Sequence, residues 1–335
     1  MSFKDIPGQE RTKRLLKRMA RAGTLPHAVL FSGMAGVGKL RVARELAKLV
    51  NCLEPRDDES CDRCISCRKI DEGHHPDLFV IRSEGTFIKL DRIRELRERV
   101  RFRPFEGRFR VVIIENAQHL HDESGNALLK VLEEPPRANL FLLTAIEPQM
   151  LLPTIVSRCS HLRLQPLEDE VIAGELAASL KIPEAQAREL TRLSGGSLDR
   201  AQWLAREEHL SHWKEIVENL RKSERSGTAD VLAMAGRWAQ QKEDLEQDLE
   251  CVKLWVRDLL LSRVIDGYRQ AFEPDDPCAV CGGEVSPDSL LTLYDRVEES
   301  IGRLRGNANK QLVMESICLN IKDVLYGKGC WNPLP

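Results

Sequence analysis

A glycine-rich stretch near the amino terminus constrains the fold most strongly. In the segment FSGMAGVGKL, the glycines and the lysine are Gly33, Gly36, Gly38 and Lys39. A loop of this type holds phosphates with its backbone N–H groups and its lysine, and a hydroxyl after the lysine binds Mg²⁺. Leu40 occupies the hydroxyl position and cannot ligate a cation that requires oxygen. The sequence therefore predicts a phosphate loop that lacks its metal ligand.

The flanking segments support this interpretation. A short apolar run at residues 28–31 precedes the loop, as expected for a buried parallel strand. Apolar residues at helical spacing follow it: Leu40, Ala43, Leu46, Ala47 and Val50. A strand, a glycine loop and a helix in this order are the context in which the motif binds phosphate. The alternative is a glycine turn without a ligand.

Further apolar segments alternate with helical patterns. They predict strands at residues 77–81, 111–114, 140–144 and 161–164. Strands separated by helices favour a parallel sheet with helices on both faces, which binds ligands at the carboxyl ends of its strands. From residue 168 onward the pattern is helical alone. We therefore expect an α/β unit followed by helical segments.

The residues after strand 111–114 differ from those of a working ATPase. In such enzymes this strand ends in an Asp that helps to hold Mg²⁺, and a Glu that activates water often follows. Here Glu115 is followed by Asn116, which cannot accept a proton. Because Leu40 and Asn116 are independent losses, we expect no hydrolysis by this chain. Lys39 and the glycines leave room for weak ATP binding without Mg²⁺.

Four thiols within sixteen residues predict a metal site. They are Cys52, Cys61, Cys64 and Cys67. Four thiolates suit a structural tetrahedral Zn²⁺ site, an iron–sulfur cluster is an alternative, and unligated thiols are a third. His74 or His75 could replace one ligand, although we expect both to be exposed in a turn. A second pair, Cys278 and Cys281, resembles half a zinc ribbon and stays open between a partner-dependent and a metal-free site.

Composition narrows the functional classes. The 335 residues suffice for two or three domains. A formal net charge of -2 gives no bulk signature of a nucleic-acid binder. An apolar signal region and a long uncharged apolar run are both missing, which favours a cytoplasmic protein with no membrane partner.

One basic segment interleaves arginines with Phe102, Phe105 and Phe109. Such a pattern can stack on and neutralise nucleic acid. We favour the alternative of a solvated loop whose phenylalanines pack into the core.

Several motifs together resemble the bacterial clamp-loader branch of the AAA+ ATPases, which serves the DNA polymerase III holoenzyme. They are Gly33 to Lys39, the four clustered cysteines, His75-Pro76-Asp77, the run from Asn126 to Pro136 that reads NALLKVLEEPP, and Ser157-Arg158-Cys159. The resemblance is specific over about residues 1–205 and weaker beyond.

The resemblance implies roles for single residues. Arg158 would be an arginine finger directed at ATP held by a neighbouring subunit, where such a residue stabilises the charge that develops in phosphoryl transfer. Thr144 would be the first sensor residue, and Arg200 the second. Glu115 and Asn116 would belong to the degenerate nucleotide site, and the clustered cysteines would hold structural zinc.

The resemblance also implies an architecture and partners. Residues 1–166 would form an AAA+ P-loop sheet domain with a zinc-binding insert at 52–67, residues 167–207 a small helical lid, and residues 208–335 an all-helical collar domain for oligomerisation. The partners would be tau/gamma-type ATPase subunits and a delta-type subunit in a hetero-pentamer, the sliding clamp, and primer-template DNA through the assembly.

Three functions follow from these features. The first is a non-hydrolysing clamp-loader subunit that donates Arg158 in trans while the sliding clamp is loaded on primed DNA. The second is an ATP-hydrolysing subunit of the same loader, and the third is a zinc-dependent DNA-binding module. Nothing in the chain resembles a polymerase active site, so a DNA-directed DNA polymerase activity would belong to the holoenzyme.

Overall fold

A computed structural model describes residues 2–83, 87–223, 226–240, 245–268, 270–272, 285–306 and 308–326. Contacts within the chain divide it into two compact units, Met1–Ala201 and Gln202–Pro335. The predicted boundaries at 166/167 and 207/208 stay predictions. Cys278 and Cys281 lie outside the described residues.

The first unit is built on a five-stranded sheet in which every strand pairing is parallel. The strands are β1 (Ala28–Ser32), β2 (Leu78–Ile81), β3 (Arg110–Ile114), β4 (Asn139–Ala145) and β5 (Ser160–Arg163). Their order across the sheet is β2-β3-β4-β1-β5. This parallel sheet and the helices that follow it confirm the predicted α/β fold class.

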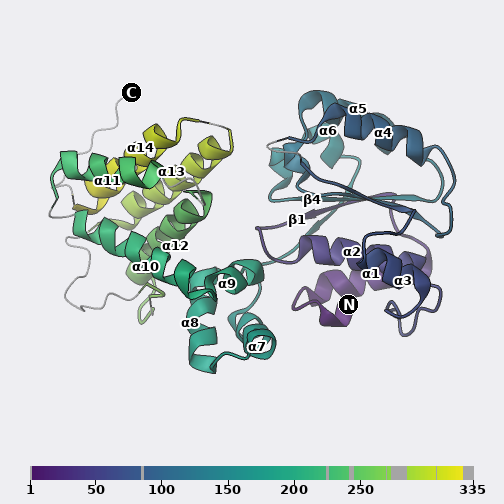
Figure 1. The fold of residues 1–335 in the computed structure, drawn as a ribbon, viewed down its shortest axis with the longest axis horizontal. Helices are drawn as coiled ribbons and strands as arrows, with labels where there is room; N and C mark the ends of the chain where they lie inside the picture. Colours follow the sequence, from purple (N-terminus) through teal and green to yellow (C-terminus); the bar gives the residue numbers. More distant parts are fainter. Residues whose placement is uncertain are drawn as a thin grey trace. The chain divides into compact units, whose positions relative to one another are not determined.

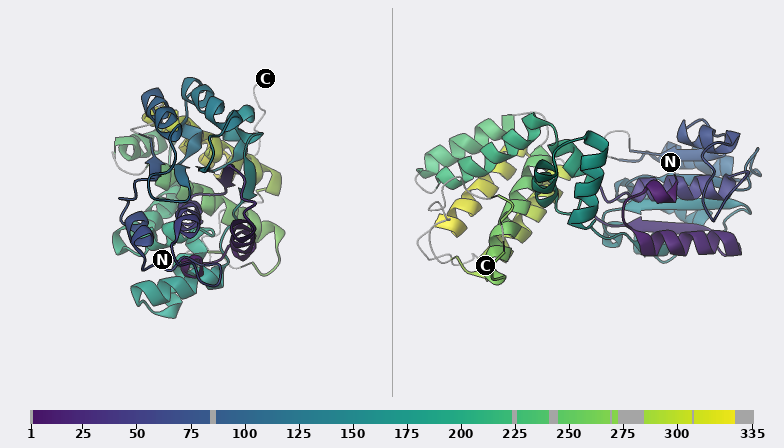
Figure 2. Two further views of the ribbon diagram at one scale, coloured as in Figure 1. Left: turned by 90° about the vertical axis from the view of Figure 1, so that its right-hand side faces the viewer. Right: turned by 90° about the horizontal axis from the view of Figure 1, so that it is seen from below.

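Helices cover both faces of the sheet, as Figures 1 and 2 show. On one face lie α1 (Glu10–Ala22), α2 (Lys39–Asn51) and α3 (Ile65–Asp71); on the other lie α4 (Leu90–Val100), α5 (Asp122–Glu133) and α6 (Pro153–Val156). Short 3-10 turns occur at Phe3–Asp5, Ala117–His119 and Pro148–Met150.

The apolar strands explain the layered packing. Along β4, Leu140 and Leu142 enter one core cluster, and Phe141 and Leu143 enter the other. Successive side chains of a strand point to opposite faces, so a strand covered on both sides must be apolar throughout. This is why the central strands lack a polar alternation.

Three helices follow the sheet: α7 (Asp169–Leu180), α8 (Glu184–Ser194) and α9 (Leu198–Leu204). The turn between α8 and α9 contains Gly195 and Gly196, both with positive φ. The carbonyl oxygen of Gly196 accepts a hydrogen bond from the Leu167 N–H at 2.9 Å. This bond ties the start of α9 to the chain that leaves the sheet.

The second unit is helical throughout its described residues (Figure 2). Its helices are α10 (Glu207–Lys222), α11 (Thr228–Gln240), α12 (Leu245–Val264), α13 (Pro287–Arg305) and α14 (Lys310–Tyr326). Trp213 and Trp255 are fully buried in its core. Among the described residues of both units, no helix has the length and apolar character needed to cross a membrane.

Candidate functional site

The phosphate loop lies between β1 and α2, as predicted. Gly33, Gly36 and Gly38 all have positive φ, at 142°, 77° and 94°. At Gly36 a Cβ atom would lie 2.0 Å from Ser197 Oγ, so the position excludes a side chain on steric grounds as well. Glycine is therefore required here both by the backbone conformation and by the close approach of the turn before α9.

Lys39 is engaged with the loop itself. Its Nζ donates hydrogen bonds to the carbonyl oxygens of Gly33, at 2.6 Å, and Met34, at 2.8 Å. Burial lowers the pKa of Lys39 to about 8, although the nearby Asp199 carboxylate acts in the opposite direction. The ammonium group thus has oxygen partners within the chain in place of a phosphate.

The start of α9 closes over the loop. The Leu198 N–H donates a hydrogen bond to the Gly36 carbonyl oxygen at 3.1 Å. A guanidinium nitrogen of Arg41 lies 3.6 Å from a carboxylate oxygen of Asp199. Both contacts join the phosphate loop and the first turn of α2 to α9.

The cavity that remains at the phosphate loop has a volume of about 10 Å³. Sites for small molecules and cofactors usually measure about 300 to 1,000 Å³. The lining residues are Ile6, Pro7, Gly36, Val37, Gly38, Arg41, Leu167, Leu198 and Asp199. This cavity is far smaller than such a site, and the first turn of α9 lies against the loop beside it.

The carboxyl ends of β3 and β4 bring together three other predicted residues. The Asn116 N–H donates to Thr144 Oγ1 at 2.9 Å, and Asn116 has a left-handed backbone with φ of 52°. Glu115 accepts a hydrogen bond from Arg82 Nε at 2.7 Å. Leu40 packs against the core on the α2 side of the sheet. Each of these side chains or backbone groups therefore has a partner within the chain, and their role in a degenerate nucleotide site stays a prediction.

Arg200 lies in the first turn of α9. Its Nη1 donates to the Ser194 carbonyl oxygen at 3.1 Å, and its backbone N–H donates to Ser197 Oγ at 3.2 Å. These contacts hold the guanidinium group at the carboxyl end of α8. The second sensor role of Arg200 stays a prediction.

Arg158 follows α6, which lies with α4 and α5 on one face of the sheet. Its Nη1 donates to the Thr154 carbonyl oxygen at 2.9 Å and to Ser157 Oγ at 3.2 Å, and its Nη2 lies 2.7 Å from Glu133 Oε1. The Arg158 side chain is 34% exposed. Burial raises the pKa of the adjacent Cys159 thiol to about 11, which keeps it neutral. The guanidinium group is thus oriented and open to solvent.

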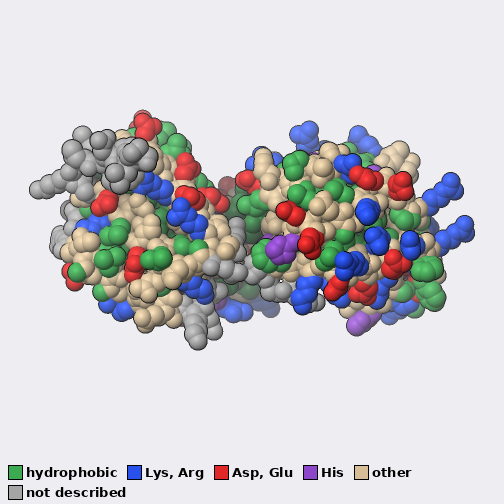
Figure 3. All heavy atoms as spheres, turned by 90° about the horizontal axis from the view of Figure 1, so that it is seen from above, with side chains coloured by type: hydrophobic (Ala, Val, Ile, Leu, Met, Phe, Trp, Pro, Cys, Tyr) green, Lys and Arg blue, Asp and Glu red, His purple; other side chains and the backbone are tan. Residues whose placement is uncertain are grey.

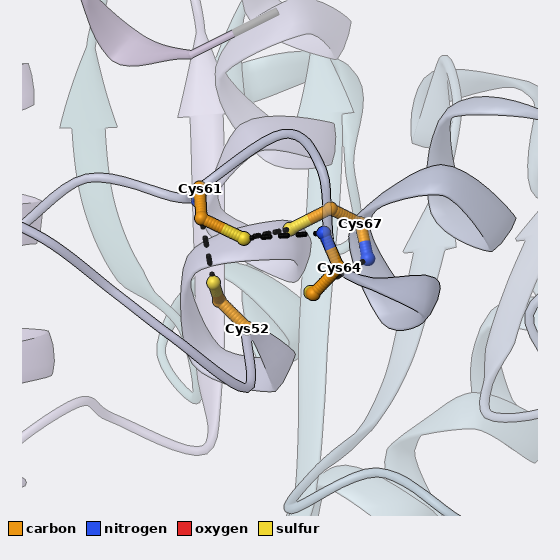
Figure 4. Close-up of side chains that lie close together, drawn as sticks. All are labelled: Cys52, Cys61, Cys64 and Cys67. Atoms are coloured by element: carbon orange, nitrogen blue, oxygen red, sulfur yellow. Dashed lines mark hydrogen bonds between the residues drawn. The ribbon is translucent and has the colours of Figure 1, made fainter.

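The four predicted cysteines converge, as Figure 4 shows. Their Sγ atoms all lie within 4.8 Å of one another, and the Sγ atoms of Cys61 and Cys67 are 4.0 Å apart. A tetrahedral zinc site with Zn–S bonds of about 2.3 Å separates its sulfur atoms by about 3.8 Å. The four residues can therefore hold a metal ion with little rearrangement.

Backbone groups prepare these thiols for a cation. The N–H of Cys61 donates to Cys52 Sγ, and the N–H of Cys64 donates to Cys61 Sγ, both at 3.3 Å. Burial raises the pKa values of Cys52 and Cys67. At Cys61 burial acts the same way, but the N–H groups of Arg63 and Cys64 outweigh it and lower the pKa to about 6. A bound cation would compensate the cost of charging the remaining thiols.

A cluster of charged groups around the buried Lys48 fastens the cysteine insert to α2. The Lys48 ammonium group, 1% exposed, contacts Asp62, Asp71 at 3.0 Å and Glu45 at 3.5 Å. Ser60 Oγ donates to Glu45 Oε1 at 2.5 Å. Burial raises the pKa of Glu45 to about 7, although Ser60 and Lys48 oppose it. The insert is thus anchored by charges that only the folded chain brings together.

Of the two histidines predicted to be exposed, one is exposed and the other is buried. His74 is exposed, as expected, but His75 is buried, which contradicts the expectation of an exposed turn. His75 Nε2 lies 3.2 Å from Ser66 Oγ, and its Nδ1 accepts the Asp77 N–H at 3.1 Å. Burial lowers the pKa of His75. Both ring nitrogens are used in the folded turn, and the metal-ligand cluster of the described residues contains cysteines alone.

Sequence reasoning missed the role of Asp77. Its carboxylate is fully buried and accepts the N–H groups of Phe105, Glu106 and Gly107 at 2.7, 2.8 and 2.9 Å. Arg110 Nη2 adds a contact at 3.3 Å. Burial raises the pKa of Asp77, but these donors and Arg110 outweigh it and lower the pKa. In the sequence, Asp77 is an acidic residue at the start of a predicted strand. This position alone does not indicate that its carboxylate binds the backbone of residues 105–107.

The loop that Asp77 holds corrects another expectation. Phe102 is 72% exposed and Phe105 is 83% exposed, so neither packs into the core. Only Phe109 packs against the core cluster. The surrounding face, formed by α4, α5 and α6, carries acidic side chains among its basic ones (Figure 3).

The chain matches the family model described as DNA polymerase III, delta subunit, over residues 8–168. It is 30% identical to DNA polymerase III subunit delta' of Bacillus subtilis, over 94% of this chain and 96% of that protein. It is 40% identical to DNA polymerase III subunit tau/gamma of Haemophilus influenzae, over 52% of this chain but only 25% of that longer protein.

Among solved structures, a DNA polymerase III gamma subunit-related protein of Thermotoga maritima is similar. It is 18% identical, with a TM-score of 0.47, over 93% of this chain and 99% of that one.

Proposed function

This chain belongs to the family of DNA polymerase III delta-prime subunits, and from that premise we propose that it is a clamp-loader subunit that does not hydrolyse ATP itself. In this proposal it supplies Arg158 in trans to a neighbouring ATPase subunit while the loader places the sliding clamp on primed DNA. The observation that carries the proposal is the contrast between a phosphate loop covered by the start of α9 and a partly exposed, oriented Arg158.

Three features support the lack of hydrolysis. Leu40 provides no oxygen ligand for Mg²⁺, and Asn116 cannot act as a base. Lys39 already donates to two carbonyl oxygens of its own loop. We infer that ATP binding is weak or absent and that no Mg²⁺ binds at this site. Thr144 and Arg200 would stand at the two sensor positions of this degenerate site, and both also make internal contacts.

The geometry of Arg158 supports a finger. A guanidinium group has five N–H donors, and the contacts within the described residues engage three of them. The remaining donors, on Nε and Nη2, are available to phosphate oxygens. Their positive charge would stabilise the negative charge that develops as a γ-phosphoryl group is transferred.

We assign the cysteine cluster to structural zinc. The converging Sγ atoms and the N–H donors around them favour a closed four-sulfur site, which leaves no position for water or substrate. Cys52, Cys61, Cys64 and Cys67 would hold the ion, and its role would be to stabilise the insert. No step of the proposed reaction passes through it.

The family relation supports partners and a division of the chain. We propose tau/gamma-type subunits and a delta-type subunit as neighbours in a hetero-pentamer, with the clamp and primer-template DNA reached through the assembly. The helices of residues 208–335 would form the collar that joins the subunits, and residues 167–207 the lid. A cytoplasmic location follows from this role in replication.

The test is ATP turnover, stimulated by clamp and primed DNA, in a loader reconstituted with this chain or with Arg158→Ala. We expect no ATP turnover by the chain alone. We expect the loader with Arg158→Ala to lose most of the turnover at the neighbouring ATPase site that Arg158 contacts. Arg188→Ala is a matched control, because Arg188 is exposed and pairs with Glu184 at 2.5 Å. An unchanged Arg158→Ala loader would refute the finger.

The retained glycines and Lys39 favour one alternative, an ATP-hydrolysing subunit of the same loader. The same experiment separates the two, since turnover by this chain alone would establish the alternative.

A further inference from the structure

Glu133 and Arg158 join two elements that are separated in the sequence by β4. Glu133 is the last residue of α5, and Arg158 follows α6, which packs against α5 (Figure 1). The distance from Glu133 Oε1 to Arg158 Nη2 is 2.7 Å. A charge-assisted contact of this length has favourable hydrogen-bonding geometry.

With this contact, three groups of the chain bind the Arg158 guanidinium group. Thr154 and Ser157 bind Nη1 from within the α6 turn, and Glu133 binds Nη2 from another helix. Contacts to Nη1 alone would leave the guanidinium plane free to rotate about that nitrogen. The contact of Glu133 with Nη2 is a second fixed point, and it holds the plane in one orientation. The donors on Nε and Nη2 that remain then point in a defined direction.

Stability does not account for the pair. The side chains of Arg158 and Glu133 are 34% and 47% exposed. Ion pairs at such exposure contribute little to folding. The pair can still matter for catalysis through orientation. A catalytic group that is already held in the productive geometry loses no conformational entropy when the reaction occurs.

We propose that Glu133 is a positioning residue that orients Arg158 for the phosphate group of the neighbouring subunit. This inference rests on the proposed function, since it assigns Arg158 the role of a finger. Glu133 touches neither ATP nor the reacting atoms.

The next residue provides a matched control. Glu134 is also exposed, and its side chain has no hydrogen bond or ion pair to any residue that the structure describes. The substitutions Glu133→Gln and Glu134→Gln remove the same charge from neighbouring positions. Any difference between them therefore reports the contact with Arg158 and not the local charge.

The experiment compares purified, fully assembled loaders that contain the wild-type chain, Glu133→Gln, Glu134→Gln, Arg158→Ala or the Glu133→Gln/Arg158→Ala double variant. We expect Glu133→Gln to lower kcat roughly tenfold, about the effect of one charge-assisted hydrogen bond. The KM for ATP and the Tm of the isolated chain should not change, because ATP is held by another subunit and the pair is exposed. The double variant should be no slower than Arg158→Ala alone.

The outcomes separate the two proposals. If the Arg158→Ala loader has the kcat of the wild type, Arg158 is not an arginine finger, and the positioning role of Glu133 is wrong as well. If Arg158→Ala is slow but Glu133→Gln matches Glu134→Gln, the finger stands and the positioning role is overturned. A faster Glu133→Gln loader would also overturn it, because Glu133 would then restrain Arg158. Additive losses in the double variant would show that Glu133 acts through another group.

Discussion

The carbonyl oxygen of Gly36 accepts a hydrogen bond from the Leu198 N–H, 3.1 Å away. One residue belongs to the phosphate loop and the other begins α9. The bond holds the start of α9 against the phosphate loop, beside a cavity of about 10 Å³. The phosphate loop of this chain is thus a docking surface for its own helix.

This docking predicts the effect of Gly36→Ala. The added Cβ would lie 2.0 Å from Ser197 Oγ at a φ of 77°. Gly73→Ala is the control, because Gly73 has nearly the same φ, 76°, and open space around it. Both variants carry the backbone strain of about 1 to 3 kcal/mol, so Gly36→Ala should lose about 1 to 2 kcal/mol more from overpacking. Thermal unfolding measures the difference, and equal losses would contradict the docking.

Asp77→Asn should destabilise the first unit. An asparagine cannot accept all four of the hydrogen bonds that the Asp77 carboxylate accepts, and Arg110 would lose its buried partner. Breaking a buried pair costs about 3 to 5 kcal/mol. Denaturant unfolding measures this loss. Asp91→Asn is the control, because the Asp91 side chain is 87% exposed and its loss should have little effect.

The same carboxylate predicts a pH dependence. The pKa of Asp77 is lower in the folded chain than its usual value of about 3.9. The charged form therefore stabilises the native state above about pH 4, and this stabilisation is lost as the pH falls through the native pKa. The free energy of unfolding of Asp77→Asn should fall less in acid than that of the wild-type chain. A parallel fall in both proteins would be inconsistent with the assignment.

Metal removal should loosen the insert. We expect the purified chain to contain about one zinc ion, and Cys64→Ser to contain much less, because four thiolates form the closed site. Cys159→Ser should retain the metal, since Cys159 lies outside the cluster. Elemental analysis and Tm before and after chelation test this. A chain that keeps its Tm without metal would argue against a structural ion.

The phenylalanines of the basic loop should differ in their contribution to stability. Phe105→Ala should change the free energy of unfolding by less than about 0.5 kcal/mol, because Phe105 is 83% exposed. Phe109→Ala should cost about 3 kcal/mol, because Phe109 packs against the core. Denaturant unfolding compares the two. A large loss for Phe105→Ala would mean that its ring has a packing partner.

Local patterns in the sequence were sufficient for much of the fold and the site. The buried strands, the phosphate loop and its missing hydroxyl at Leu40 depend on neighbouring residues alone. The cysteine cluster also follows from local spacing, because sixteen residues of chain suffice to surround one ion. In each case the residues that matter are close together along the chain.

Tertiary structure decided the features that depend on distant residues. Leu198 closes over Gly36, Glu133 meets Arg158, and Asp77 holds the loop of Phe105, although each pair is more than twenty residues apart. His75 is buried by the same packing. The amino-acid sequence by itself determined the strands, the loop and the clustered cysteines, because propensity, periodicity and spacing act locally. Which groups face each other across the folded chain depends on how the helices pack on the sheet, and no local pattern records that.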